Sequence, residues 1–129
     1  MSRWITFSVL TAFVLAIAGC GKSGPKLIEV TGFVKYDGQP VAEGDITFLP
    51  VDKTVAGEGG KIKDGRYTMK VKEGKNQVSI MATRAVPGKK GPMGEELTEQ
   101  YIPGKYNDST ELTVDVAPGT TEHNFDLKK

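Results

Sequence analysis

Cys20 is the only cysteine in the 129-residue chain, and the residues before it could direct a modification of its thiol. It directly follows Ile17, Ala18 and Gly19, which are aliphatic or small. These residues end a mostly apolar stretch that begins just after the positive charge of Arg3. A positive start, an apolar stretch and small residues before a cleavage point form the layout of a secretory signal. The sequence therefore predicts export and lipidation at Cys20.

The apolar stretch is too short to be a membrane span. It covers residues 4–18, whereas a helix that crosses a bilayer needs ~20 apolar residues. Residues 21–25 are small, charged or proline and cannot continue the stretch. We expect a signal peptide at 1–19, a lipidated cysteine with its tether at 20–26 and a folded domain at 27–129. Two alternatives stay open: an ordinary signal peptide or an uncleaved anchor, each with an incidental cysteine.

The residues Ile17-Ala18-Gly19-Cys20 resemble the lipobox of bacterial lipoproteins, in which a branched aliphatic and two small residues precede the cysteine. The resemblance implies a diacylglycerol thioether on Cys20, removal of the signal peptide and acylation, as with palmitate, of the new amine. Two or three acyl chains anchor a protein durably, because each buried methylene adds ~0.8 kcal/mol. The next residue is Gly21, not the aspartate that retains some lipoproteins at the inner membrane. The resemblance therefore favours the outer membrane.

The charge balance argues against a nucleic-acid partner. The chain has 17 basic and 16 acidic residues, and removal of the signal peptide takes away only Arg3. The mature chain is then formally neutral, whereas nucleic-acid binding needs a clustered basic surface. A single cysteine cannot form a disulfide within the chain. One domain of this size must be stabilised by packing and by sheet hydrogen bonds.

His123 is the only histidine and the only candidate of its type for acid–base chemistry. It lies between Glu122 and Asn124 on an expected strand, where a solvated residue is commoner than a general base. Glu122 and His123 together are too few ligands for a metal site. We therefore expect no catalytic residue, no metal, no cofactor and no enzymatic activity.

From residue 27 onward, apolar residues alternate with polar ones in short segments, which is the period of half-buried strands. The residues expected to point inward are Val30, Gly32, Val34, Tyr36, Ile46, Phe48, Tyr67, Met69, Val71, Val78, Ile80, Ala82, Leu112, Val114, Val116, Phe125 and Leu127. Asp37-Gly38 marks a turn, and Asp64-Gly65 predicts a tight hairpin. Residues 51–60 are polar and rich in glycine, so we expect a loop there, and the last two strands are joined across Pro118-Gly119.

This pattern predicts an all-β fold, an antiparallel β-sandwich of about seven strands in transthyretin-like or immunoglobulin-like form. We expect six of the inward residues to meet in one core: Phe48, Tyr67, Val78, Ile80, Val114 and Phe125.

Several segments resemble the carboxypeptidase regulatory-like, or transthyretin-like, β-sandwich of small bacterial lipoproteins: Val30-Thr31-Gly32-Phe33-Val34, Asp37-Gly38-Gln39-Pro40-Val41, Gly44-Asp45-Ile46-Thr47-Phe48, Asp64-Gly65-Arg66-Tyr67, Tyr101-Ile102-Pro103-Gly104-Lys105-Tyr106-Asn107 and Asn124-Phe125-Asp126-Leu127. The resemblance covers nearly all of the mature chain and implies an accessory, non-catalytic domain. The hydroxyisourate hydrolases of the transthyretin-like group use several histidines and a C-terminal Tyr-Arg-Gly-Ser. This chain has one histidine and ends in Lys128-Lys129.

Residues 85–107 break the alternation with prolines, glycines and mixed charges. Met93, Leu97 and Tyr101 have helical spacing, which predicts one or two turns of helix. Long segments of this kind are often binding elements or are disordered. We therefore name a candidate interaction loop with the contact residues Lys89, Lys90, Tyr101, Ile102, Lys105 and Tyr106. In the alternative, the tyrosines pack onto the sandwich and the lysines are solvated.

Together these features predict an extracytoplasmic, lipid-anchored module of the cell envelope with a structural or protein-interaction role. Its partners would be the membrane, through the lipid on Cys20, and an envelope protein or glycan. A second hypothesis is a small-molecule or carbohydrate binding or carrier protein, which would need a concave site with a few convergent polar groups. A transthyretin-like hydrolase comes third.

Replacing Cys20 with alanine tests the lipidation. We expect the wild type to incorporate a palmitate analogue and to sediment with membranes, and the Cys20→Ala variant to do neither. Metabolic labelling and fractionation measure both. A variant that stays membrane-bound, beside a wild type that takes up no label, would contradict the prediction.

Overall fold

Nearly all of the described chain is β-structure. The computed structural model describes residues 26–129; the expected signal peptide at 1–19 and Cys20 lie outside these residues. The strands are β1 (Leu27–Tyr36), β2 (Gln39–Pro40), β3 (Glu43–Pro50), β4 (Glu58–Lys63), β5 (Arg66–Lys72), β6 (Gly74–Met81), β7 (Thr83–Lys90), β8 (Glu96–Gln100), β9 (Thr113–Val116) and β10 (Phe125–Leu127), with one 3₁₀ helix, η1 (Gly104–Tyr106). Within residues 26–129, no helix has the length and apolar character of a membrane span.

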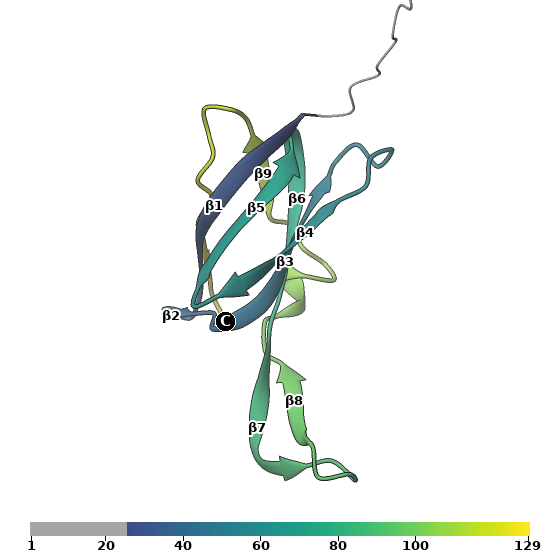
Figure 1. Cartoon of the computed structure of the whole chain (residues 1–129), viewed down its shortest axis with the longest axis vertical. Helices are drawn as coiled ribbons and strands as arrows, with labels where there is room; N and C mark the ends of the chain where they lie inside the picture. The colour runs from purple at the N-terminus through teal and green to yellow at the C-terminus, as the bar shows by residue number, and fades with distance from the viewer. Residues whose placement is uncertain (1–25) are drawn as a thin grey trace, which may run out of the picture.

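One sheet forms the body of the molecule, in the order β10-β1-β5-β4-β3-β6-β9, with β2 beside β1 (Figure 1). β4 and β5 pair only beside their shared turn, at Lys63 and Arg66. The sheet folds over at this point, so its two halves, β10-β1-β5 and β4-β3-β6-β9, face each other. β1 and β10 run parallel, and every other strand pair is antiparallel. The expected all-β sandwich is confirmed.

Three aromatic rings connect the two halves. The ring centroid of Phe48, on β3, lies 6.0 Å from that of Tyr67, on β5, and 6.4 Å from that of Phe125, on β10. Of the six expected core residues, all are buried except Val114, which is half-buried against the core. The rest of the core is aliphatic, and each such side chain contributes ~1.5–3 kcal/mol when fully buried. It consists of Ile28, Val30, Val34, Val41, Ile46, Ile62, Val71, Val78, Ile80, Ala82, Ile102, Val116 and Leu127.

Both Asp-Gly pairs form the tight turns that the sequence predicts. Asp37 and Asp64 have φ angles of 50° and 51°, and the glycines that follow them have φ angles of 81° and 75°. Two successive residues with positive φ angles give the backbone twist that a two-residue hairpin turn needs. The second turn joins β4 to β5, where Gly65 donates its N–H to the Val41 carbonyl at 2.7 Å. The turns therefore position the strands that follow them.

The expected loop at 51–60 is wrong at its end, because residues 58–60 belong to β4. Gly59 and Gly60 pair with Thr47 and Ile46 of β3. A Cβ at Gly60 would lie 2.8 Å from the Met69 sulfur. Glycine is thus needed where Met69 of the next strand covers β4, and here it marks a close approach rather than a loop.

The helix expected from Met93, Leu97 and Tyr101 is also wrong, because residues 83–100 form the antiparallel β7–β8 hairpin. Met93 lies in its turn and is 94% exposed. The spacing of three apolar residues does not produce a helix here, because no core lies beside the segment to bury an apolar face. In the turn, Gly91 donates its N–H to the Glu95 carbonyl at 2.8 Å.

The last two strands exist as expected but do not pair with each other. β9 pairs with β6, and β10 pairs with β1. Residues 117–124, which include Pro118-Gly119, therefore carry the chain from one half of the sandwich to the other.

Truncation of Ile80 tests the core. The side chain of Ile80 is fully buried on β6, and that of its neighbour Met81 is 46% exposed. We expect Ile80→Ala to lower the free energy of unfolding by about 2–5 kcal/mol, and Ile80→Asp to prevent folding. The matched control, Met81→Ala, should change the free energy of unfolding by less than about 0.5 kcal/mol. Urea denaturation followed by circular dichroism measures these values, and equal losses at both positions would contradict the core assignment.

Candidate functional site

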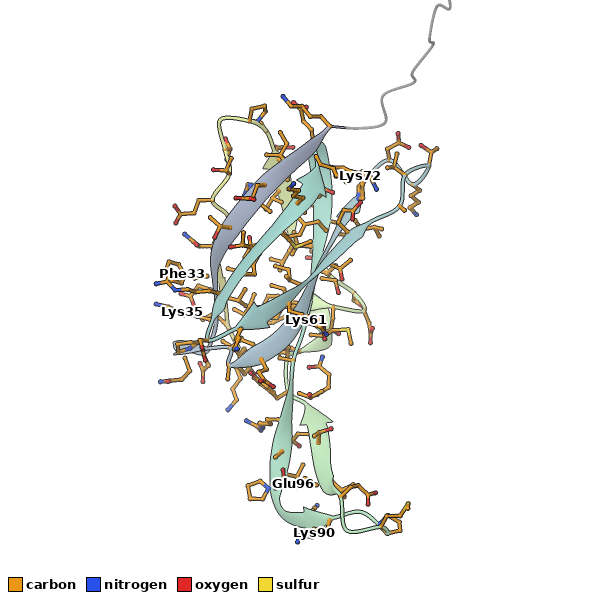
Figure 2. The ribbon with its side chains drawn as sticks, viewed as in Figure 1. Phe33, Lys35, Lys61, Lys72, Lys90 and Glu96 are labelled. Atoms are coloured by element: carbon orange, nitrogen blue, oxygen red, sulfur yellow. The ribbon has the colours of Figure 1, made fainter. Side chains whose placement is uncertain are left out.

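The β7–β8 hairpin is the most prominent surface feature and extends away from the sandwich (Figure 1). Every residue of β8 is exposed, and so is every residue of β7 except the half-exposed Val86. Arg84 donates through Nε to a Glu99 carboxylate oxygen at 2.8 Å. Lys90 lies opposite Glu96 near the far end (Figure 2). The hairpin is thus a paired arm of balanced charge with both faces in water.

The base of the hairpin is fixed to the core. Only Ala82 separates β7 from the core strand β6. The Gln100 side-chain oxygen accepts hydrogen bonds from the N–H groups of Ala82, at 3.2 Å, and Ile102, at 3.0 Å. The buried Asn107 side chain donates to the carbonyls of Ile80, Ile102 and Pro103, at 3.1–3.2 Å. These hydrogen bonds hold the start and the end of the hairpin together.

The structure distributes the six candidate contact residues over four places. Lys89 and Lys90 are exposed near the hairpin turn. Ile102 belongs to the core, with 4% of its surface exposed. Lys105 and Tyr106 lie in η1, where the Tyr106 hydroxyl accepts a hydrogen bond from the Lys128 N–H at 2.9 Å.

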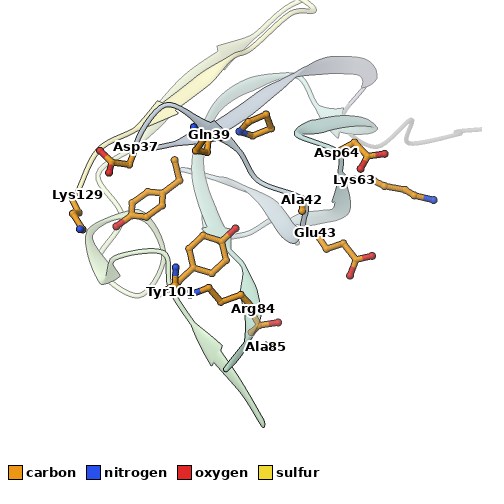
Figure 3. Close-up of a pocket in the computed structure, with 13 residues that line it drawn as sticks. Asp37, Gln39, Ala42, Glu43, Lys63, Asp64, Arg84, Ala85, Tyr101 and Lys129 are labelled. Atoms are coloured by element: carbon orange, nitrogen blue, oxygen red, sulfur yellow. The ribbon is translucent and has the colours of Figure 1, made fainter. Parts of the chain in front are cut away.

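Tyr101 occupies the fourth place, where it lines a pocket. This pocket has a volume of about 720 Å³ and lies between the hairpin base and the end of the sandwich that carries the two Asp-Gly turns (Figure 3). The ring centroids of Tyr101 and Tyr36 are 5.7 Å apart. The guanidinium carbon of Arg84 lies 5.1 Å from the Tyr101 centroid. Partial burial raises the pKa of the Tyr101 hydroxyl, and the charge of Arg84 opposes that shift.

His123 takes part in packing mainly through its backbone. Its carbonyl accepts a hydrogen bond from the Tyr67 hydroxyl at 2.6 Å, and its N–H donates to the Thr31 carbonyl at 2.9 Å. A Cβ at Gly32 would lie 1.9 Å from the same His123 carbonyl oxygen. The absence of a side chain at Gly32 therefore lets residues 121–124 lie directly on β1. The His123 ring contacts the Thr120 carbonyl through Nε2, at 3.1 Å.

Among residues 26–129, no group of three or more His, Cys, Asp or Glu side chains is arranged to hold a metal ion. The arrangement that the pocket offers is instead two aromatic rings, one guanidinium and several exposed carboxylates and amines. This combination can bind a ligand by stacking and hydrogen bonding.

Sequence reasoning missed Tyr36, Arg84 and Gln100 as residues that build one region. The opposite charges of Arg84 and Glu99, at positions that a hairpin would place side by side, are the signal that could have paired β7 with β8. Tyr36 was expected to point inward, and it is half-buried at the edge of the core.

Comparison with known proteins assigns no family to this chain. No protein-family model and no curated protein matches the chain. Among solved structures, a 9R-lipoxygenase from Cyanothece PCC8801 aligns with a TM-score of 0.34 and 10% identity, over 79% of this chain and 16% of the lipoxygenase. This chain therefore spans about a sixth of the length of that protein. A likeness at this score carries no argument about function.

The hydrogen bond between Tyr67 and His123 gives a pH-dependent prediction. Burial raises the pKa of the Tyr67 hydroxyl well above its ordinary value of 10.0. In the unfolded chain the Tyr67 hydroxyl loses its proton near pH 10, whereas in the folded chain the hydroxyl stays protonated at that pH. The free energy of unfolding should therefore fall as the pH rises above about 10. Below about pH 10 both states are protonated, and this contribution is fully present.

We expect Tyr67→Phe to lower the free energy of unfolding at neutral pH by about 0.5–1.5 kcal/mol. Between about pH 8 and pH 11, the free energy of unfolding should fall less in this variant than in the wild type. Tyr106→Phe, which removes a half-buried hydroxyl elsewhere, is the control. Urea denaturation at several pH values measures the slopes. Identical alkaline slopes for wild type and Tyr67→Phe would count against the prediction.

Proposed function

We propose that this chain is a lipid-anchored module of the bacterial cell envelope that binds another envelope protein through the β7–β8 hairpin and performs no catalysis itself. The position of the hairpin carries the proposal. It lies at the opposite end of the long axis from the start of β1 (Figure 1).

The proposed lipid anchor on Cys20 would hold the start of β1, the end opposite the hairpin, close to the membrane. Six residues, 21–26, separate Cys20 from Leu27, where β1 begins. An extended chain spans at most ~3.3–3.6 Å per residue, so a lipid on Cys20 keeps the start of β1 within roughly 25 Å of the membrane. The hairpin then lies at the end of the domain farthest from the tether, where a partner protein can reach it.

The edges of the hairpin favour a protein as the partner. Within the described residues, β7 and β8 pair only with each other, so each strand has a free edge. A free edge can bind an extended segment of another protein through backbone hydrogen bonds. β7 contains Pro87 and two lysines, which are features that protect an edge from pairing. β8 contains no proline and no lysine, so we assign the contact to β8.

The proposal extends to the family, a small lipoprotein with a carboxypeptidase regulatory-like domain. Its support is the all-β sandwich together with the two Asp-Gly turns at the places where the sequence pattern has them. The non-catalytic role rests on the single histidine, which the fold uses through its backbone.

Site-specific photo-crosslinking in intact cells tests the proposed contact. A benzophenone amino acid at Leu97, which is exposed on β8, is compared with the same amino acid at Lys70, which is exposed on β5. We expect one or a few discrete crosslinked proteins from Leu97 and none of them from Lys70. In a Cys20→Ala background, the Leu97 crosslinks should weaken, because the module is no longer held at the membrane. Equal patterns from both positions, or none from Leu97, would contradict the proposal.

A further inference from the structure

The pocket at the hairpin base goes beyond the proposed function, because it does not depend on the free edge of β8. Two parts of the fold build it: the turn residues of the sandwich, around Asp37 and Asp64, and the hairpin base, around Arg84 and Tyr101. Its volume of about 720 Å³ falls in the range of small-molecule sites, ~300–1,000 Å³. Both parts are held by backbone hydrogen bonds, from Asp64 to the Ala42 carbonyl at 2.8 Å and from Tyr101 to the Ala82 carbonyl at 3.1 Å. The pocket is therefore formed before any ligand arrives.

The four tyrosines of the chain fall into two pairs by the use of their hydroxyls. The Tyr67 hydroxyl donates to the His123 carbonyl, and the Tyr106 hydroxyl accepts from the Lys128 N–H. The structure gives the Tyr36 and Tyr101 hydroxyls no hydrogen-bond partner within residues 26–129, and both rings are only half-buried. Tyrosine at such a position offers an apolar face with a polar tip. These two rings thus provide a stacking surface and two free hydroxyls at one place.

Arg84 lies beside this surface with part of its hydrogen-bonding capacity unused. Its Nε binds Glu99, which fixes the direction of the side chain, while its two terminal amino groups have no partner among the described residues. In Figure 3, Arg84 and Tyr101 lie together, with Asp37 to one side and Glu43 to the other. Guanidinium groups donate hydrogen bonds and carboxylates accept them. The pocket therefore presents donors and acceptors around an aromatic surface.

The charged residues that line the pocket favour a neutral, polar ligand. Three carboxylates, of Asp37, Glu43 and Asp64, are matched by the three cations Lys63, Arg84 and Lys129. A phosphate or another anion would meet the carboxylates, and a purely apolar ligand would leave the charged groups without partners. A neutral polyol with an apolar ring face suits the site, because its hydroxyls donate to carboxylates and accept from guanidinium while its C–H face packs on tyrosine.

We infer that this pocket binds a neutral saccharide unit of an envelope glycan, with Tyr36 and Tyr101 as the stacking surface and Arg84 as the main hydrogen-bond donor. The lipid-anchored end of the chain and the glycan-binding end would then lie at opposite ends of the sandwich.

Titrations followed by the NMR chemical shifts of the full-length protein test this inference. The protein is held in a detergent without a sugar headgroup, and the probes are maltotriose and tri-N-acetylchitotriose, with inorganic phosphate and sialyllactose as charged comparisons. We expect saturable shifts at residues 36–43, 83–85 and 101 with at least one neutral trisaccharide. The charged comparisons should give no tighter binding.

Variants assign the binding to the pocket. Tyr101→Ala should weaken it at least tenfold, and Tyr36→Phe and Tyr101→Phe by about threefold to tenfold each, as expected for one lost hydrogen bond. Thr68→Val removes an exposed hydroxyl on β5, outside the pocket, and should leave the dissociation constant unchanged. The phenylalanine variants keep the rings, so an altered affinity with an unchanged spectrum elsewhere reports the hydroxyl and not the fold.

Three results would overturn the inference: no saturable shift with either neutral trisaccharide, tighter binding of phosphate or sialyllactose, or an unchanged affinity in Tyr101→Ala. None of these results affects the crosslinks expected from Leu97, so failure here and failure of the protein contact on β8 are distinguishable.

Discussion

The contact of Phe48 with Tyr67 and Phe125 is the interaction on which the rest of the structure depends. Residues 26–129 contain no cysteine, so within them the two halves of the sandwich are held by side-chain packing and by the chain connections. Tyr67 extends this contact to the surface, because its ring belongs to the core and its hydroxyl holds the His123 carbonyl. This hydrogen bond fixes residues 117–124, which connect β9 to β10. The Leu127 carbonyl at the end of β10 accepts from the N–H of Asp37, which lines the pocket. Core packing and pocket geometry are thus linked by four contacts.

The strands of the sandwich could be predicted because each has one face in the core and one in water. In β1, β5 and β6 the apolar residues therefore alternate, and local sequence is sufficient to show it. The hairpin could not be predicted in the same way. Both faces of β7 and β8 are solvated, so no apolar alternation marks them, and the accidental spacing of Met93, Leu97 and Tyr101 indicated a helix. Gly60 was misjudged for a different reason. Its role depends on Met69 of the neighbouring strand, a contact that the sequence of β4 alone does not contain.

At the candidate site too, features set by neighbouring residues could be predicted, and features set by contacts between distant residues could not. The Asp-Gly turns were expected from two residues each, but their common position at one end of the sandwich depends on the strand order. Tyr101 was singled out from its segment, while its neighbour Tyr36 comes from a strand 65 residues earlier in the chain. The hairpin base brings them together, because Gln100 and Asn107 hold the returning chain against β6. The hairpin and the pocket therefore share one support, the hydrogen bonds of Gln100 and Asn107.

The parallel pairing of β1 with β10 sets the order in which the molecule can be completed. Phe33 on β1 binds the Asn124 side chain, 91 residues further along, through its backbone N–H. A polypeptide that emerges from a ribosome or a membrane pore with its N-terminus leading presents β1 first and β10 last. Until β10 arrives, the outer edge of β1 is an open template on which another chain can pair. Closure of the sandwich therefore follows synthesis of β10, and a truncation before Phe125 would leave one edge of β1 unpaired at residues 34–36.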